Sequence, residues 1–230
     1  MKSFSGKRKQ KLADDLLLYA ITDRAWINVP PDASEPQRRE AICAQVSQAI
    51  AGGATIIQMR EKHLNDWDMV DEADALRKIC NEAGVPFIVN DDVAVAVASQ
   101  ADGVHIGQDD MAVQDARAVI GARKILGVSA QTVEEAIAAE EAGADYLGVG
   151  AVFPTSSKDD AVDVSLETLT AIVDAVNIPV VAIGGITGAN VSKLASSGIC
   201  GVSVISAIFA QKDITAAAAD LKQKVITALH

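Results

Sequence analysis

The sequence predicts an α/β protein in which one domain forms a closed (β/α)8 barrel of the TIM-barrel type, with a short N-terminal extension. Short β-branched apolar runs alternate with alanine-rich amphipathic stretches along the chain. The apolar runs are continuous, as expected for parallel strands that are covered on both faces. Eight such pairs in 230 residues leave about 29 residues for each, which suits a βαβ unit.

Each apolar run that ends in Gly, Asn, Asp or Ser is predicted to be a strand, and a helix is expected after it. The predicted strands are 16–22, 55–59, 86–89, 103–106, 125–128, 146–149, 179–183 and 201–205. The predicted helices are 35–51, 65–83, 93–99, 113–120, 132–142, 166–176, 189–197, 207–211 and 214–229. Glycine is a common stop signal just past a helix, and it recurs at Gly53, Gly84, Gly143 and Gly198. A doubly wound sheet is the alternative, but no GxGxxG follows an early strand.

The chain termini, cysteines and composition exclude several classes of protein. Residues 1–15 are basic and are expected to be a mobile tail or a helix that covers one end of the barrel, which spans 16–230. No stretch suits a signal peptide or a membrane span, so we expect a cytoplasmic protein.

Three distant cysteines, Cys43, Cys80 and Cys200, are interpreted as buried reduced thiols. A net charge of −11 and 3% aromatic residues argue against nucleic-acid binding.

Polar residues gather after seven of the eight predicted strands, where a barrel places its active site. After the second strand, Gln58, Arg60 and Lys62 alternate and would project to one side. Two cations and an amide suit a diphosphate, although a solvated strand end is equally consistent with this pattern. Asp91 and Asp110 follow adjacent strands and suit Mg²⁺. Taken singly, each aspartate is better explained as a helix N-cap.

Three further segments could bind an anion. Gly184 and Gly185, followed by Thr187, look like a backbone nest at the start of the helix expected from Ala189, and Ser206 would complete a phosphate cup. A plain glycine turn is the alternative. Residues 155–158, which include Lys158, could close over an anionic ligand or form an ordinary polar loop. Ser129 could contact a ligand or cap the next helix.

The three histidines restrict the chemistry. His105 lies in an apolar strand and is interpreted as a hydrogen-bonded core histidine rather than a ligand. The sequence has no paired-histidine metal site of the kind that sugar-phosphate epimerases use. No lysine lies inside a predicted strand, which disfavours a Schiff-base aldolase.

Seven segments, taken together, resemble the thiamine-phosphate synthase family. They are LYAITD (18–23), QMREK (58–62), VND (89–91), GVHIGQDD (103–110), GVS (127–129), VFPT (152–155) and VAIGGI (181–186). Each segment alone is weak evidence, but seven in order at the spacing of barrel units are specific. The resemblance extends from about Leu18 to Ala210.

The resemblance implies an enzyme that joins hydroxymethylpyrimidine diphosphate to hydroxyethylthiazole phosphate, which gives thiamine phosphate and diphosphate. By resemblance, the pyrimidine diphosphate would contact Gln58, Met59, Arg60, Glu61, Lys62, Asn90, Ser129 and Lys158. Asp91 and Asp110 would bind Mg²⁺. The thiazole phosphate would contact Thr155, Ser156, Ser157, Gly185, Ile205 and Ser206. The catalytic residues would be Arg60, Lys62, Lys158 and Ser129, with the cations stabilising the departing diphosphate.

The sequence departs from the family pattern at three places, and alternatives remain. Asp92 stands where arginine is common, residues 155–158 read TSSK where TPTK is usual, and Gln131 stands where relatives often carry histidine. A thiazole tautomerase or regulatory barrel protein is the nearest alternative, although such relatives tend to use that histidine. A non-catalytic phosphate sensor is another, but it would not need both Asp91 and Asp110. We expect small phosphorylated substrates as partners, and a homodimer is left open.

Overall fold

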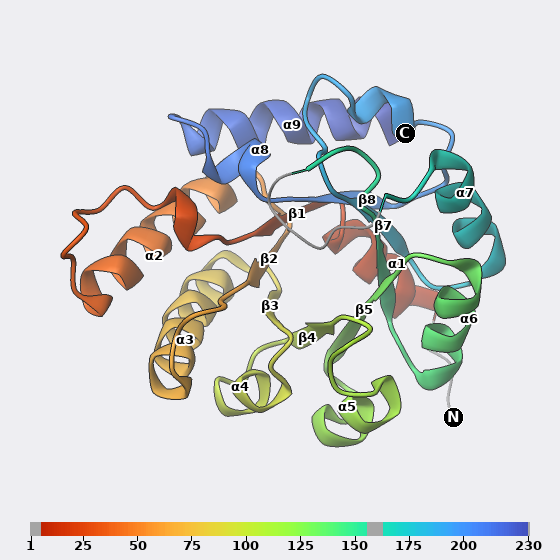
Figure 1. Cartoon of the computed structure of the whole chain (residues 1–230). Helices are drawn as coiled ribbons and strands as arrows, with labels where there is room; N and C mark the ends of the chain where they lie inside the picture. Colours follow the sequence, from red (N-terminus) through yellow and green to blue (C-terminus); the bar gives the residue numbers. More distant parts are fainter. Residues whose placement is uncertain (1–5, 156–162, 230) are drawn as a thin grey trace.

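A computed structural model of the chain describes residues 6–155 and 163–229, and its strands close into a parallel barrel (Figure 1). Each strand pairs with its neighbour in sequence, and the eighth pairs with the first. The strands are Leu18–Ile21 (β1), Ile56–Met59 (β2), Phe87–Asn90 (β3), Gly103–Ile106 (β4), Ile125–Ala130 (β5), Tyr146–Val149 (β6), Val180–Ile183 (β7) and Gly201–Val204 (β8). The predicted TIM-barrel class is confirmed.

Helices surround the barrel and begin at the polar residues that the sequence places before them. Asn65, Asp92, Thr132 and Ser165 each accept a backbone N–H in the first turn of the next helix. The helices are Gly6–Asp15 (α1), Glu35–Ala51 (α2), Asp66–Ala83 (α3), Val93–Ala98 (α4), Val113–Ile120 (α5), Val133–Ala142 (α6), Leu166–Ala175 (α7), Ser206–Phe209 (α8) and Ile214–Leu229 (α9). Two short 3-10 helices are Arg24–Trp26 (η1) and Val191–Leu194 (η2).

Side chains alternate between two cores along each strand. On β1, Leu18 and Ala20 face the helices and belong to the large outer core. Tyr19 and Ile21 belong to a smaller core inside the barrel. Both faces of the strands are therefore buried, which explains why the strand sequences read as continuous apolar runs.

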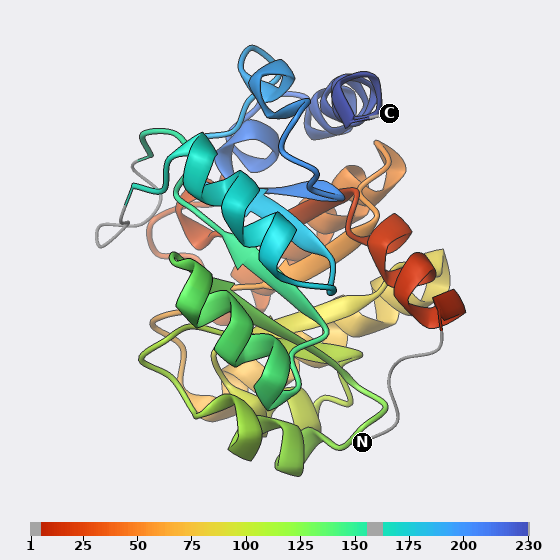
Figure 2. The same cartoon turned by 90° about the vertical axis from the view of Figure 1, so that its right-hand side faces the viewer.

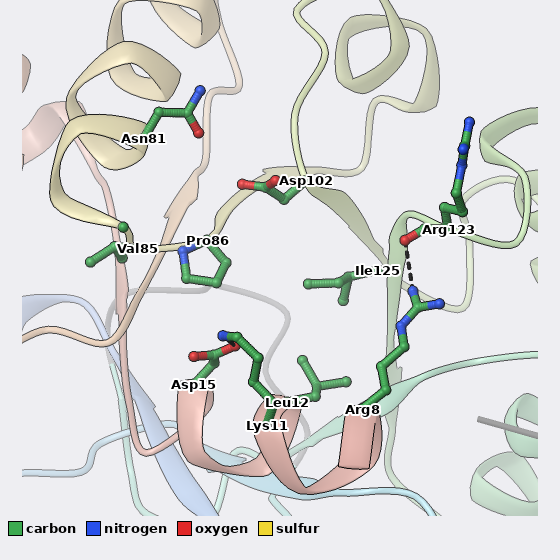
Figure 3. Close-up of a pocket in the computed structure, with 11 residues that line it drawn as sticks. Arg8, Lys11, Leu12, Asp15, Asn81, Val85, Pro86, Asp102, Arg123 and Ile125 are labelled. Atoms are coloured by element: carbon green, nitrogen blue, oxygen red, sulfur yellow. Dashed lines mark hydrogen bonds and ion pairs between the residues drawn. The ribbon is translucent and has the colours of Figure 1, made fainter. Parts of the chain in front are cut away.

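Helix α1 covers the end of the barrel opposite the carboxyl ends of the strands (Figure 2). Its Leu12 and the following Leu16 are buried against the inner core. Arg8 donates hydrogen bonds to the carbonyl oxygens of Ala122 (3.2 Å) and Arg123 (2.6 Å). A hollow of about 340 Å³ lies beside α1 (Figure 3). Of the two expected structures for the N-terminal segment, residues 6–15 form the covering helix.

One predicted helix is wrong and a second is displaced. The segment predicted as a helix over 189–197 contains only η2. There, the Asn190 side chain donates to the Gly185 carbonyl and accepts from the Thr187 N–H, which holds the chain in turns. The helix predicted over 207–211 begins and ends earlier, as α8.

The three cysteines carry free thiols, but only Cys80 is fully buried. Cys43 and Cys200 are half-buried, which corrects the expectation for these two residues. Burial raises the pKa of both Cys80 and Cys200 to about 12. These two thiols are therefore protonated and unreactive at neutral pH. Among the described residues, no helix has the length and apolar character needed to span a membrane.

Candidate active site

A cavity of about 480 Å³ lies at the carboxyl ends of the strands. This volume is within the usual range for small-molecule sites, about 300–1,000 Å³. It brings together predicted residues from both halves of the barrel. They are Gln58, Arg60, Lys62, Asn90, Asp91, Asp110, Ser129, Thr155, Gly185, Ile205 and Ser206.

Two predicted substrate-binding residues lie away from this cavity. Met59 is fully buried in the outer core, and Glu61 turns toward η1, where it pairs with Arg24 at 2.8 Å. Gln58, Arg60 and Lys62 line the cavity instead. The period-two alternation of an extended chain explains this division, because every second side chain points away from the lumen.

Behind the β2 loop, Arg24 pairs with three carboxylates. Its guanidinium contacts Glu35 (2.6 Å), Glu61 (2.8 Å) and Glu72 (2.5 Å), and the Glu72 side chain is 0% exposed. Burial, together with the Glu72 carboxylate, raises the pKa of Glu61 to about 8, while Arg24 opposes this shift. A proton held on Glu61 offsets the excess negative charge of the cluster. The cluster fixes the backbone between Arg60 and Lys62.

Stability should therefore fall as pH rises from 4.5 to 8. In this range the unfolded chain ionises Glu61, whose ordinary pKa is 4.5, while the folded chain keeps it protonated to about pH 8. The unfolded state then binds fewer protons, so the free energy of unfolding decreases by at most about 1.4 kcal/mol per pH unit and levels off above the folded pKa. Glu61→Gln should remove this decrease, as measured by urea unfolding at pH 5, 7 and 9.

A matched control is Glu82→Gln, an exposed glutamate on α3. This variant should keep the wild-type pH dependence. An unchanged slope in Glu61→Gln would show that Glu61 does not carry the proton.

Asp91 and Asp110 both line the cavity, and neither caps a helix. The helix cap of α4 is Asp92, which accepts from the Val95 N–H at 2.8 Å, and the cap position of α5 is Ala112. Asp91 adopts a φ of 62°, a left-handed conformation that residues with a Cβ rarely take. The N-cap interpretation is therefore wrong for both residues, and the strained backbone of Asp91 places its carboxylate at the cavity.

This pair of carboxylates fits Mg²⁺. Asp110 accepts the Gly107 N–H through Oδ2 at 2.7 Å, which orients the carboxylate. The described residues contain no group of three or more His, Cys, Asp or Glu arranged for a metal. An ion here would take its remaining ligands from water and from substrate oxygens, as Mg²⁺ usually does.

The opposite side of the cavity is formed by the ends of β7 and β8, which pair with each other. Gly184 and Gly185 have φ values of 97° and 62°. A Cβ on Gly185 would lie 2.4 Å from the Pro154 carbonyl oxygen, so this close approach requires glycine. Ser206 is the first residue of α8. The Gly-Gly turn is present, but it does not open a helix at Ala189.

Ser129 and His105 form a contact that the sequence analysis missed. His105 Nε2 and Ser129 Oγ lie 3.0 Å apart, and the cap of α6 is Thr132 rather than Ser129. His105 is hydrogen-bonded as expected, but it is half-buried and lines the cavity. Val104 and Ile106 face the outer core, so strand alternation was the signal that His105 points into the barrel.

The cavity also contains polar side chains that the sequence analysis did not select as site residues. They are Gln108, Asp109, Gln131 and Ser203. Gln108 donates to the Ser129 carbonyl at 2.6 Å. The predicted residues Ser156, Ser157 and Lys158 lie outside the described residues.

The fold and this cavity define an enzyme of the (β/α)8-barrel class that acts on small molecules at the carboxyl ends of its strands. The model of the thiamine monophosphate synthase family matches residues 18–208. The chain belongs to this family, and it is therefore a transferase of thiamine biosynthesis.

Individual relatives agree with this assignment. The thiamine-phosphate synthase of Ruminiclostridium cellulolyticum is 46% identical over 207 residues, covering 90% of this chain and 94% of the relative. That of Chloroflexus aurantiacus is 47% identical over 212 residues, covering 92% of this chain and 93% of the relative. The solved structure of the thiamine phosphate pyrophosphorylase of Pyrococcus furiosus is 40% identical in sequence and has a TM-score of 0.83. The match covers 95% of this chain and 100% of that chain. These similarities favour the synthase over the tautomerase or regulatory alternative.

Proposed function

We propose that this enzyme makes thiamine phosphate from a hydroxymethylpyrimidine diphosphate and a hydroxyethylthiazole phosphate. The observation that carries the proposal is the arrangement of the cavity. Arg60, Lys62 and two carboxylates lie at the ends of β2–β4, and the Gly-Gly turn and Ser206 lie across the barrel at β7–β8. Two separate anion-binding sides suit two phosphorylated substrates.

In the proposed reaction, the bond between the pyrimidine methylene carbon and the diphosphate oxygen breaks, and diphosphate leaves with the electron pair. The thiazole nitrogen gives its lone pair to the same carbon. Because this nitrogen is already a neutral nucleophile, the reaction requires no general base. Arg60, Lys62 and Lys158 would bind the diphosphate and stabilise the charge that develops on its oxygens.

Asp91 and Asp110 are the residues that would hold Mg²⁺. When bound, the ion adds positive charge beside the departing diphosphate. Gln58, Asn90 and Ser129 would help to hold the pyrimidine diphosphate, while Thr155, Ser156, Ser157, Gly185, Ile205 and Ser206 would hold the thiazole phosphate. These assignments carry over the roles that the resemblance implies.

The test follows diphosphate release by purified protein supplied with both substrates and Mg²⁺. We expect thiamine phosphate and diphosphate to form in equal amounts, and EDTA or omission of the thiazole phosphate to prevent product formation. Absence of thiamine phosphate above the enzyme-free background would overturn the proposed function.

Three further properties are part of the proposal. We assign residues 1–15 as an extension and 16–230 as the catalytic barrel. A cytoplasmic location suits two phosphorylated substrates, which do not cross membranes unaided. Light scattering of the purified protein would decide whether it forms a homodimer.

A further inference from the structure

A chain of five hydrogen-bonded side chains crosses the inside of the barrel. Gln58 Nε2 donates to Tyr19 Oη at 2.7 Å, and Tyr19 Oη lies 2.8 Å from Tyr146 Oη. Tyr146 Oη lies 2.9 Å from His105 Nδ1, and His105 Nε2 lies 3.0 Å from Ser129 Oγ. The two ends of the chain, Gln58 and Ser129, both line the active-site cavity.

The middle of this chain is buried. The exposed fractions of Tyr19 and Tyr146 are 1% and 0%, and burial raises the pKa of both phenols above the ordinary value, so both remain protonated at neutral pH. Each phenol therefore has one proton to donate. In a buried site, an unmade hydrogen bond is costly, so each proton is expected to have an acceptor.

Proton counting gives the chain a direction. Because Tyr19 accepts from Gln58, the proton of Tyr19 points to Tyr146. The proton of Tyr146 then points to His105 Nδ1, which must be the unprotonated ring nitrogen. A neutral His105 in this tautomer carries its proton on Nε2 and donates it to Ser129. Ser129 keeps its own proton for a group in the cavity, and Gln58 presents its carbonyl oxygen.

Two glycines, Gly127 on β5 and Gly148 on β6, leave space for this chain inside the barrel. A Cβ on Gly127 would lie 2.3 Å from Tyr146 Oη and 2.5 Å from His105 Nδ1. On β6, a Cβ on Gly148 would lie 3.1 Å from His105 Cε1. Glycine at 127 therefore permits the contact between Tyr146 and His105.

We propose that Tyr19, Tyr146 and His105 are positioning residues that fix the hydrogen-bond polarity at the two ends of the chain. Gln58 is held as an acceptor, which suits the amino group of the pyrimidine, and Ser129 is held as a donor. The inference rests on the proposed function only for the identity of this ligand. Reversing the polarity requires the Gln58 amide to flip, the hydroxyl protons to turn and the His105 ring proton to move from Nε2 to Nδ1.

Tyr19→Phe and Tyr146→Phe should each interrupt the chain while keeping its rings packed. Either break lets the wrong polarity compete, and the apparent affinity is then the intrinsic affinity multiplied by the fraction of molecules in the competent state. We expect the KM for the pyrimidine diphosphate to rise about three- to tenfold in each variant, with little change in the KM for the thiazole phosphate. The double variant should match the single ones, because the chain is already broken.

The control is Ile88→Val, which alters the same inner core without touching a polar atom. It should lower stability and leave both KM values unchanged. If the rise in KM of the double variant equals the product of the two single rises, the tyrosines act independently through packing, and the proposal is overturned.

A spectroscopic readout does not depend on activity. Imidazole ¹⁵N shifts can be measured on histidine-labelled protein, which has three histidines, with His105→Gln used to assign the signal. We expect the Nε2–H tautomer in the wild type and a mixture of tautomers in Tyr146→Phe. An Nδ1–H tautomer in the wild type would contradict the direction of the chain. Failure of the synthase assay with these shifts intact would instead overturn the proposed function.

Discussion

Asp91→Asn is expected to reduce synthase turnover by about 10²-fold or more while the protein remains folded. The substitution removes the negative charge that we assign to Mg²⁺ and keeps the size of the side chain. Asparagine tolerates the φ of 62° at this position, so the backbone should not change. Alanine would be a less informative substitution, because it adds backbone strain to the loss of the carboxylate.

Asp92→Asn is the matched control for this prediction. Asp92 caps α4 through Val95 and does not line the cavity. Asparagine is also a good N-cap, so this variant should keep stability and turn over within about twofold of the wild type. When activity is titrated with Mg²⁺, only Asp91→Asn should need a higher concentration of the ion to reach half of its maximal activity. Equal losses in the two variants would mean a general electrostatic effect rather than a metal ligand.

Arg60→Gln is expected to lower kcat by about 10²- to 10³-fold. The Arg60 side chain is 15% exposed, lines the cavity, and lies 3.8 Å from the Asp23 carboxylate. Its guanidinium is therefore positioned to bind two diphosphate oxygens at once through two N–H groups. Arg60→Lys should recover part of the lost rate, because it restores the charge but not the planar pair of donors.

Arg39→Gln serves as the control for Arg60. Arg39 pairs with Asp68 and Asp71 of α3, outside the cavity. Its loss should change stability slightly and leave kcat within about twofold, as expected for an ion pair outside the site. A wild-type kcat in Arg60→Gln, measured at saturating concentrations of both substrates, would remove Arg60 from the proposed mechanism.

The barrel and the cationic side of the cavity could be predicted because both follow from strand periodicity. Each short apolar run became a strand, and the alternation of Gln58, Arg60 and Lys62 placed all three side chains at the cavity. The same alternation turned Met59 and Glu61 away, although both belong to the motif that resembles the family. Motif membership and orientation toward a ligand are separate properties.

Contacts between distant segments could not be predicted from the sequence. The Arg24 cluster joins residues from η1, α2, the β2 loop and α3, and no local pattern links them. The contact between Tyr19 and Tyr146 joins β1 to β6 across the lumen. The helix predicted after β7 failed for a local reason, since the side chain of Asn190 satisfies backbone groups that a helix would otherwise use.

The position of α1 has a kinetic consequence. Leu12 of this helix and the following Leu16 fill the far end of the barrel, so among the described residues the cavity opens at the carboxyl ends of the strands. Both substrates and both products then share one route, and a product that lingers there obstructs the next substrate. Such a shared route favours product inhibition of the enzyme. Diphosphate should compete with the pyrimidine diphosphate, and thiamine phosphate should compete with the thiazole phosphate.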